Sequence, residues 1–581
     1  MEVNDTTRVR VGSTVELKRE GRLTGKVGSL PVVVFWHEGR AWAIEDRCPH
    51  MGFPLHQGTV EEGLVTCHWH HARFDLSSGC TLDPFADDAT GFDVVCDGDD
   101  VLVAARPTGD PLGHVWGRLD DGLESGITLV IAKSVLGLRD LGVPDAEIVR
   151  RGLDFGTRYN DSGWGAGLTV LVAMANLLPV LDADDEAVAL VHGLRFVARD
   201  TGGRPPRFPL RPFDGAGDGV DAGRLADWYR RFVDTRSGDA AERVLATSLA
   251  AGTPLDEVER TMFAAVTDHV FLDGGHTLDF TNKAFEALDH VGVELADEVL
   301  PTLVHQTARA SRSEESGTWR HPHDLPVLVD ETVARLPDAL ARGARVEDRF
   351  GEQSVVGLGW ALLEDDPHAV VDALVDAIGA GATAEQLGRG LAYAAALRIA
   401  RFHVQNDFGD WDTVHHAFTT ANALHHALVR TPSPELYRGL VHGALRVYLD
   451  RFLNVPAARL PRATSGDLAE LEECWEVQGQ VDRAGAIAAG YLRGGGDPAR
   501  LLARLGHVLL HEDAEFHGYQ VVEAGVRQFH AWPAGSEEGI VILSGVTRFL
   551  AAHTPTRREL SRVVDIATRL RRGEALYEET G

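Results

Sequence analysis

Two short segments near the N-terminus each pair a cysteine with a histidine, and they constrain the fold more than any other feature of the chain. The first, CPHMGFPL, begins at Cys48 and carries His50, and the second, CHWHHARFDLSSG, begins at Cys67 and carries His70. Thiolate sulfur and imidazole nitrogen are good ligands for transition metals. We therefore expect both loops to direct their ligands to one metal centre, with the surrounding chain folded around it.

The residues around these loops are typical of an antiparallel β domain. The stretch VVVFWHEGRAWAIED predicts a hairpin with Gly39 and Arg40 at its turn, and GFDVVCDGDDVLVAA predicts a second with Asp97 and Gly98 at its turn. Alternating β-branched residues with Gly and Asp turns at this spacing favour a small antiparallel sandwich over residues 8–106.

A set of two cysteines and two histidines also suits zinc, so the ligand types alone leave two metals open. The two loops, with the tail WHHARFDLSSG after the second ligand pair, closely resemble the Rieske [2Fe–2S] family. This resemblance implies that Cys48 and Cys67 bind one iron of a [2Fe–2S] cluster through sulfur. It also implies that His50 and His70 bind the other iron through nitrogen.

The resemblance extends to a subgroup of that family. Respiratory-type Rieske proteins join their loops by a disulfide between two additional cysteines, whereas this chain has Phe53 and Trp69 at those positions. The domain is therefore similar to the oxygenase- and ferredoxin-type subgroup, and we expect a potential at the low end of roughly −150 to +300 mV. His68 and His71 are expected to be bystanders, and His71 stands where the family often has glycine.

Length and charge limit the classes of protein that the chain can belong to. It has 581 residues, enough for several domains, and 87 acidic against 56 basic residues give a formal net charge of −31. Such a chain repels nucleic acid and anionic membranes, so neither is an expected partner. The start lacks the features of a signal peptide, no apolar run would span a membrane, and five scattered cysteines are no disulfide scaffold. We expect a cytoplasmic protein.

The pattern of the sequence changes after the β domain. Residues 107–126 are rich in Gly, Pro and Asp, which predicts a linker. From residue 127 onward, apolar residues recur at i, i+3, i+4 and i+7, and strand signals are nearly absent. The expected fold is multidomain, with an N-terminal all-β Rieske sandwich (residues 1–106) followed by a large all-α domain.

Several segments of the helical region match one another. The sequence LVHG occurs at residues 190–193 and again at 440–443, and Asn176 matches Asn422 at a similar offset. The segment DHVFLDGGHTLDF also parallels GHVLLHEDAEFHGYQ. We therefore expect an internal duplication, with one helical half at 127–345, another at 346–581, and a cleft between them.

Polar side chains at helical spacing on apolar faces indicate the lining of that cleft. His276 and Asp279 share one predicted helix face, and His415 and Asn422 share another. We expect His276 and Asp279 to act as ligands or acid/base groups, and His415 and Asn422 to orient a substrate. A single histidine on an apolar face is more often a hydrogen-bonded core residue, and that alternative stays open.

A second metal site is a further hypothesis for the helical region. His507 and His511 stand at i and i+4, a spacing that can share one metal ion, and His517 follows closely. Iron is the metal we expect there. The adjacent histidines at 415–416 and 425–426 are not all expected to face inward, because neighbouring helical residues diverge by about 100°.

The usual partner of a Rieske cluster is a mononuclear iron held by two histidines and a carboxylate. The ring-hydroxylating oxygenase pattern D-x-x-H-x-x-x-x-H is absent, and the nearest segment, HEDAEFH, has a different spacing. A weaker resemblance, through DTVHHAFTTANALHHAL, LVHGALRVYLDRF and HGYQVVEA, is to the questin oxidase-like family. That resemblance implies a largely helical fold and oxygen insertion of the Baeyer–Villiger type.

Together these patterns predict an oxidoreductase in which a [2Fe–2S] cluster passes single electrons to a helical domain that reduces or oxygenates a small organic substrate. No G-x-G-x-x-G segment follows a predicted strand, so an external reductase or ferredoxin would supply the electrons. The alternative is a ferredoxin-like electron carrier or redox sensor whose helical repeats bind a partner protein.

Overall fold

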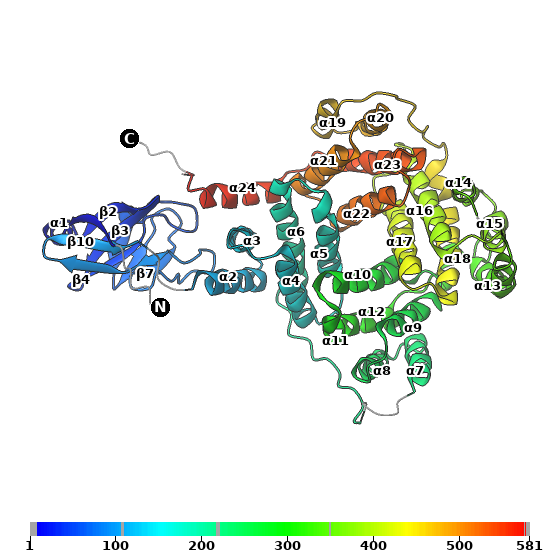
Figure 1. The fold of residues 1–581 in the computed structure, drawn as a ribbon, viewed down its shortest axis with the longest axis horizontal. Coiled ribbons are helices and arrows are strands. Elements are labelled where there is room, and N and C mark those ends of the chain that lie inside the picture. The colour runs from blue at the N-terminus through cyan, green and yellow to red at the C-terminus, as the bar shows by residue number, and fades with distance from the viewer. Residues whose placement is uncertain (1–7, 106–109, 216–220, 348–349, 575, 577–581) are drawn as a thin grey trace. The chain divides into compact units, whose positions relative to one another are not determined.

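The computed structural model divides the chain into two compact units (Figure 1). One unit comprises Met1–Pro144 together with Leu560–Gly581, and the other comprises Asp145–Glu559. The C-terminal segment thus belongs with the β domain, so the units differ from the expected divisions at residues 106, 126 and 345. The described residues are 8–105, 110–215, 221–347, 350–574 and 576.

Three antiparallel sheets form the β domain. The first has the strand order β1–β10–β9 (Arg8–Ser13, Asp100–Ala104, Val94–Asp97). The second has the order β2–β3–β4–β8 (Arg22–Val27, Leu30–His37, Arg40–Glu45, Gly91–Phe92) and the third the order β5–β6–β7 (Thr59–Glu61, Leu64–Thr66, Arg73–Asp75). Helix α1 (Thr14–Glu20) follows β1 in the chain.

Strand β3 is buried on both faces, because alternate residues along it enter two apolar cores. Val33 and Phe35 pack in the core that contains both predicted cysteine ligands, whereas Val32 and Val34 pack in the core beneath the first sheet. The two predicted hairpins are present, but each turn lies one residue away from its expected position. His37 pairs with Arg40 and Asp97 pairs with Asp100, so the turns are residues 38–39 and 98–99.

Most of the predicted linker is a helix, α2 (Pro111–Ser125), so that prediction was wrong for residues 111–125; residues 107–109 lie outside the described residues. Asp110 caps the helix by accepting a hydrogen bond from the amide of Leu112. Gly122 is small enough for close packing against α3 (Thr128–Asp140), since a Cβ there would lie 3.1 Å from atoms of Ile131. The glycines that suggested a linker thus allow helix contact.

Helices account for all regular structure among the described residues of the second unit, which confirms the expected all-α class. None of the helices in the described ranges has the length and apolar character needed to cross a membrane. The α-helices are α4 (Asp145–Tyr159), α5 (Ala166–Leu177), α6 (Ala183–Thr201), α7 (Ala222–Asp234), α8 (Gly238–Ala250), α9 (Leu255–Thr267), α10 (His276–Val291), α11 (Ala296–Val299), α12 (Val304–Arg309), α13 (Leu325–Gly343), α14 (Glu352–Ala361), α15 (Pro367–Gly379), α16 (Ala384–Ala400), α17 (Asp410–Arg430), α18 (Pro434–Leu449), α19 (Leu468–Trp475), α20 (Val481–Arg493), α21 (Pro498–His511), α22 (Phe516–His530) and α23 (Glu537–His553). Helix α24 (Glu559–Arg571) leads back to the first unit.

Four helices from distant parts of the chain form the centre of this unit. Helices α10 and α22 each pack against both α5 and α17 (Figure 1). Asn176 on α5 and Asn422 on α17 were matched in the sequence, as were the segments that contain His276 on α10 and His517 on α22. These matched residues therefore lie on the four central helices, whereas the two LVHG segments lie on α6 and α18, and the duplication itself stays a prediction.

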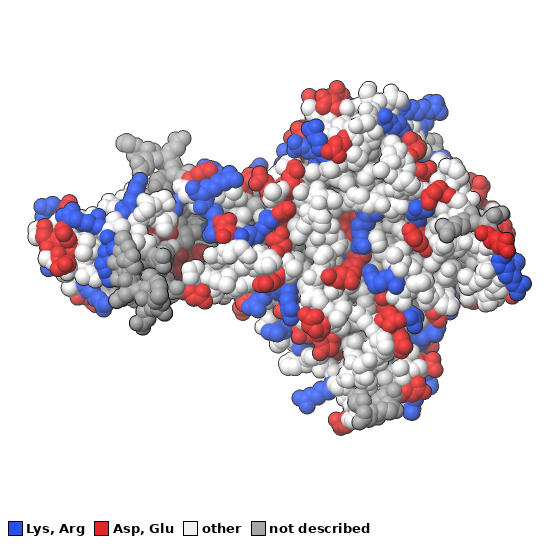
Figure 2. Space-filling model, viewed as in Figure 1, with Lys and Arg blue, Asp and Glu red and all other residues white. Residues whose placement is uncertain are grey.

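Charged side chains of both signs are spread over the visible face of the molecule (Figure 2). Acidic and basic residues alternate there, so the net charge of −31 does not gather in one patch among the residues drawn in colour. This distribution is typical of a solvated surface.

Candidate functional sites

Two loops of the β domain bring the four predicted ligand residues together. Cys48 lies in the loop after β4 and Cys67 in the loop after β6, and both side chains are buried in one apolar core. Each cysteine begins a tight turn. The carbonyl oxygen of Cys48 accepts a hydrogen bond from the amide of Gly52 (2.7 Å), and that of Cys67 accepts one from the amide of His71 (3.0 Å). These turns reverse the chain, so the cysteine and histidine of each loop lie close in space.

The donor atoms are arranged in two pairs, one of sulfur and one of nitrogen. A hydrogen bond between the thiols raises the pKa of Cys48 and lowers the pKa of Cys67 to about 6. The rings of His50 and His70 lie edge to face with centroids 4.8 Å apart. Burial lowers the pKa of His50 to about 4, and its Nδ1 is buried with no hydrogen-bond partner among the described residues. An unpartnered neutral imidazole nitrogen beside paired thiols fits the donor set of a [2Fe–2S] cluster.

Aromatic side chains surround the histidine pair on part of its surface. Phe85 contacts the ring of His50 at 5.0 Å and Trp69 contacts the ring of His70 at 4.9 Å, measured between centroids. His70 is exposed and the Trp69 side chain is 38% exposed, so one edge of the pair faces solvent. His71 has a φ of 62°, which gives a physical reason for glycine at that position in the family.

A lysine that the sequence did not indicate contacts the first loop. Lys133, on α3, donates a hydrogen bond to the carbonyl oxygen of His50 (2.9 Å) and another to that of Pro49. Burial lowers the pKa of Lys133 to about 8, so the side chain is mostly a cation near pH 7. The ammonium group therefore places a positive charge beside a predicted cluster ligand.

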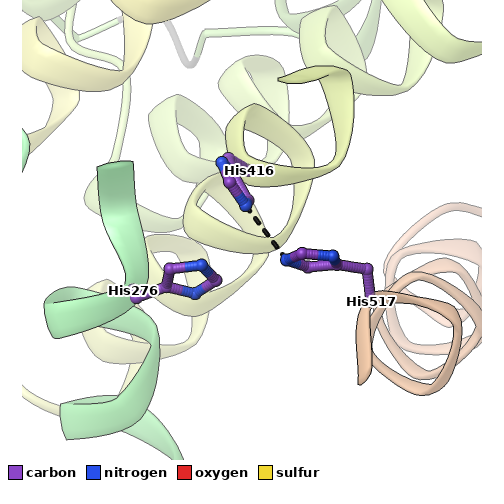
Figure 3. Close-up of side chains that lie close together, drawn as sticks. All are labelled: His276, His416 and His517. Carbon is purple, nitrogen blue, oxygen red and sulfur yellow. Dashed lines mark hydrogen bonds between the residues drawn. The ribbon is translucent and has the colours of Figure 1, made fainter. Parts of the chain in front are cut away.

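In the helical unit, three histidines from three different helices point toward one another (Figure 3). His276 is the first residue of α10, His416 lies on α17, and His517 lies at the start of α22. One nitrogen from each ring lies within 4.8 Å of the other two, and Nε2 of His416 is 3.0 Å from Nε2 of His517. We call these residues the histidine triad.

Burial keeps the imidazoles of the triad neutral. It lowers the pKa of His276 to about 4 and that of His416 to about 3, and it also lowers the pKa of His517. The neighbouring histidines of the triad also lower the pKa of His276 and that of His416. A neutral imidazole has one nitrogen with a lone pair, and it is in this form that a histidine binds a metal ion.

A turn with unusual backbone geometry positions His276. Phe271 and Asp273 both have a φ of 46°, and Gly274 and Gly275 also have positive φ. A Cβ at Gly275 would lie 2.0 Å from Oγ1 of Thr420, so only glycine fits there. Non-glycine residues in the left-handed region cost about 1–3 kcal/mol each and are common at functional sites.

The other predicted catalytic residues lie next to the triad or deeper in the helical core. The ring of His415 is fully buried, with its centroid 5.6 Å from that of His517. Asp279 accepts a hydrogen bond from Gln520, and burial raises the pKa of Asp279 to about 7. Asn422 accepts a hydrogen bond from Gln528 (2.8 Å). Of the four residues, the structure places only His276 in the triad.

The structure does not bring His507, His511 and His517 together, so the metal site predicted for these three residues was wrong. Helix α21 ends at His511 and α22 begins at Phe516, so His517 lies on a different helix, where it meets His276 and His416. His507 and His511 instead lie beside Asp185 of α6, with Nδ1 of His507 3.0 Å from the carboxylate. Nothing in the sequence around these histidines indicated Asp185, because this residue lies far away along the chain.

The expectation that the doubled histidines would not all face inward was also wrong. His415 and His425 are buried, and His416 and His426 are half-buried. Helix α17 packs against α10, α16, α18 and α22, so several of its faces are covered. Adjacent side chains on α17 do point about 100° apart, but neighbouring helices cover the helix in both of these directions. This is why the sequence missed His416.

Comparison with known proteins identifies the β domain. The family model for the Rieske [2Fe-2S] domain matches residues 7–93. A human Rieske domain-containing protein is 34% identical over 82 residues, which are 13% of this chain and 52% of that protein. The 4beta-methylsterol monooxygenase of Methylococcus capsulatus is 49% identical over 71 residues, 11% of this chain and 19% of that protein.

A third relative has nearly the size of the β domain. The ferredoxin component of the alkene monooxygenase system of Xanthobacter autotrophicus is 30% identical over 82 residues, 14% of this chain and 67% of that protein. The chain thus spans about half of the human relative and about a fifth of the sterol monooxygenase. These matches and the loop geometry agree: residues 7–93 are a Rieske [2Fe–2S] domain with an electron-transfer role, and through it the chain belongs to the Rieske iron–sulfur family.

Proposed function

We propose that the chain is an oxidoreductase in which electrons from the Rieske domain support a reaction in the helical unit. A [2Fe–2S] cluster held by Cys48, His50, Cys67 and His70 supplies one-electron transfer. The observation that carries the proposal is the histidine triad, because neutral imidazoles that converge from three helices are typical of a metal centre. The acceptor that we propose is therefore a metal ion in the helical unit, with iron favoured because it undergoes one-electron chemistry.

The reaction that we propose is the reduction or O₂-dependent oxygenation of a small organic substrate. Two of the relatives support oxygen chemistry by name, since one is a sterol monooxygenase and another is the ferredoxin component of an alkene monooxygenase system. In that system the ferredoxin is a component of its own, so we propose that an external reductase or ferredoxin supplies the electrons here as well. A reducing cytoplasm is the proposed compartment, because it would keep the cysteine ligands as thiols.

The test is the reoxidation of the reduced cluster by O₂. The full-length protein is reduced anaerobically, freed of excess reductant and mixed with oxygenated buffer, while the visible absorbance of the cluster is followed. We expect reoxidation to be markedly slower in a variant with His276→Ala and His416→Ala than in the wild type. The matched control is His507→Ala with His511→Ala, which removes two histidines of the same unit outside the triad.

Equal rates in all three proteins would overturn the proposal. The cluster would then react with oxygen, or keep its electron, without the helical unit. That result would favour the alternative, an electron carrier or redox sensor whose helical part binds a partner protein.

A further inference from the structure

We propose that the histidine triad binds one divalent transition-metal ion and leaves coordination positions open for a small exogenous ligand of the dioxygen or oxyanion class. The role of this ion as electron acceptor rests on the proposed function, whereas its binding to the triad does not. The site takes one residue from each of three helices: His276 of α10, His416 of α17 and His517 of α22.

The spacing of the triad is close to that of a loaded site. Metal–nitrogen bonds of about 2.0–2.1 Å at tetrahedral or octahedral angles place ligand nitrogens about 3.0–3.5 Å apart. The Nε2 atoms of His416 and His517 are already 3.0 Å apart, and all three nitrogens lie within 4.8 Å (Figure 3). The ring nitrogen of His276 would have to move by at most about 1.3–1.8 Å to complete the arrangement, which is within the reach of a side-chain rotation.

The partners of His517 fix which of its nitrogens faces the centre. Its Nδ1 lies 3.4 Å from a carboxylate oxygen of Asp412, while its Nε2 faces His416. A carboxylate on the far nitrogen is the usual second-shell partner of a metal-bound imidazole, because it fixes the tautomer and increases the basicity of the ligand. Asp412 thus holds His517 in the form that a metal ion requires.

A fourth imidazole gives an independent indication of a ligand. His415 is fully buried beside His517 and has no hydrogen-bond partner for either ring nitrogen among the described residues; its Nδ1 lies 3.7 Å from the carboxylate of Asp412. An unpartnered buried polar group is costly, by about 1–3 kcal/mol. A small ligand on the metal ion would give this imidazole a partner, which is why we include open coordination positions in the proposal.

The surroundings favour a transition metal over a hard cation. The ligand set is three neutral nitrogens, which suits Fe, Zn, Cu or Ni rather than Mg or Ca. The rings of Phe280 and Phe516 lie 5.5 and 5.7 Å from that of His276. The site therefore has aromatic side chains against one of its rings, and both phenylalanines are themselves half-buried.

Another group of possible ligands in the helical unit, Asp185 with His507 and His511, is a weaker candidate. One nitrogen of each ring already has a partner, because Nδ1 of His507 contacts Asp185 and Nδ1 of His511 donates to the carbonyl oxygen of His507 (2.9 Å). The two histidine side chains are also 37% and 35% exposed. This pair therefore provides a matched control.

The experiment is a titration of the purified full-length protein with Co²⁺ under anaerobic conditions, followed by calorimetry and by metal analysis after desalting. We expect the wild type to retain one Co²⁺ per chain in addition to the iron of the cluster. His416→Ala should weaken Co²⁺ binding at least about 100-fold, since loss of a second-shell partner alone costs 10–100-fold. The His507→Ala, His511→Ala variant should bind Co²⁺ as the wild type does.

Two results would overturn the site. One is a wild type that retains no Co²⁺, Zn²⁺ or Fe²⁺ beyond the cluster, and the other is metal binding that His416→Ala leaves unchanged. If His416→Ala does not fold, His416→Gln keeps the size of the side chain, and the same comparison applies. A different result would separate the two proposals. If the wild type binds the metal ion through the triad, but the triad variant reoxidises its cluster as fast as the wild type, the metal site holds and only the proposed function is overturned.

Discussion

Replacing Lys283 by methionine should be among the most destabilising single changes in the helical unit. Nζ of Lys283 donates hydrogen bonds to Glu286 (2.9 Å) and to Glu523 (2.9 Å), and the lysine side chain is 1% exposed. Arg527 contacts the same two carboxylates. These four side chains of α10 and α22 therefore balance two buried anions with two cations.

The magnitude follows from this balance. Methionine fills a similar volume but leaves two buried carboxylates with a single cation. Each hydrogen bond to a charged group contributes about 1.5–3 kcal/mol, and removing one partner of a buried ion pair typically costs 3–5 kcal/mol. We expect Lys283→Met to lower the free energy of unfolding by about 3–5 kcal/mol.

The assay is urea unfolding followed by far-ultraviolet circular dichroism, with the double variant Lys283→Met, Glu523→Gln as the control. The second change removes one negative charge and restores the balance, so the double variant should be more stable than Lys283→Met alone. A loss below about 1 kcal/mol for Lys283→Met, as for an exposed ion pair, would refute the reasoning. So would a double variant that is less stable than the single one.

Three further predictions concern the cluster and the buried acid. Lys133→Gln should shift the midpoint potential of the cluster to a more negative value, because a positive charge beside His50 favours the reduced form. Lys133→Arg keeps the charge and is the control. A redox titration that shows no shift for the glutamine variant would contradict this role of Lys133. Cys48→Ala combined with Cys67→Ala should remove both irons of the cluster, and iron that stays bound in that variant would argue against the ligand assignment. Asp279 has a pKa raised to about 7 by burial, so the folded state retains a proton that the unfolded chain releases near pH 4. Its contribution to stability is therefore fully present below about pH 4 and is lost as the pH rises to about 7. In Asp279→Asn this loss should disappear, and equal slopes of unfolding free energy against pH for both proteins would show that Asp279 does not titrate as described.

The sequence by itself identified the Rieske domain and the fold class of the two parts of the chain. The proposed ligands Cys48, His50, Cys67 and His70 lie in two short loops, and each loop carries its cysteine and its histidine only two or three residues apart. Period-two and period-3.6 patterns of apolar residues likewise follow from local geometry, and they correctly separated the β domain from the helical unit. The sequence also indicated His276 as a candidate site residue, because its predicted helix face carries several polar residues.

Only the tertiary structure decided which distant residues meet. The triad joins His276, His416 and His517 from three helices, and nothing in the local pattern around His416 distinguishes it from His415. Lys133 reaches the cluster loop, and helix α24 joins the N-terminal unit, through contacts between segments far apart in sequence. Periodicity records which face of a helix is buried but not which partner buries it, because that choice depends on how all the helices pack together.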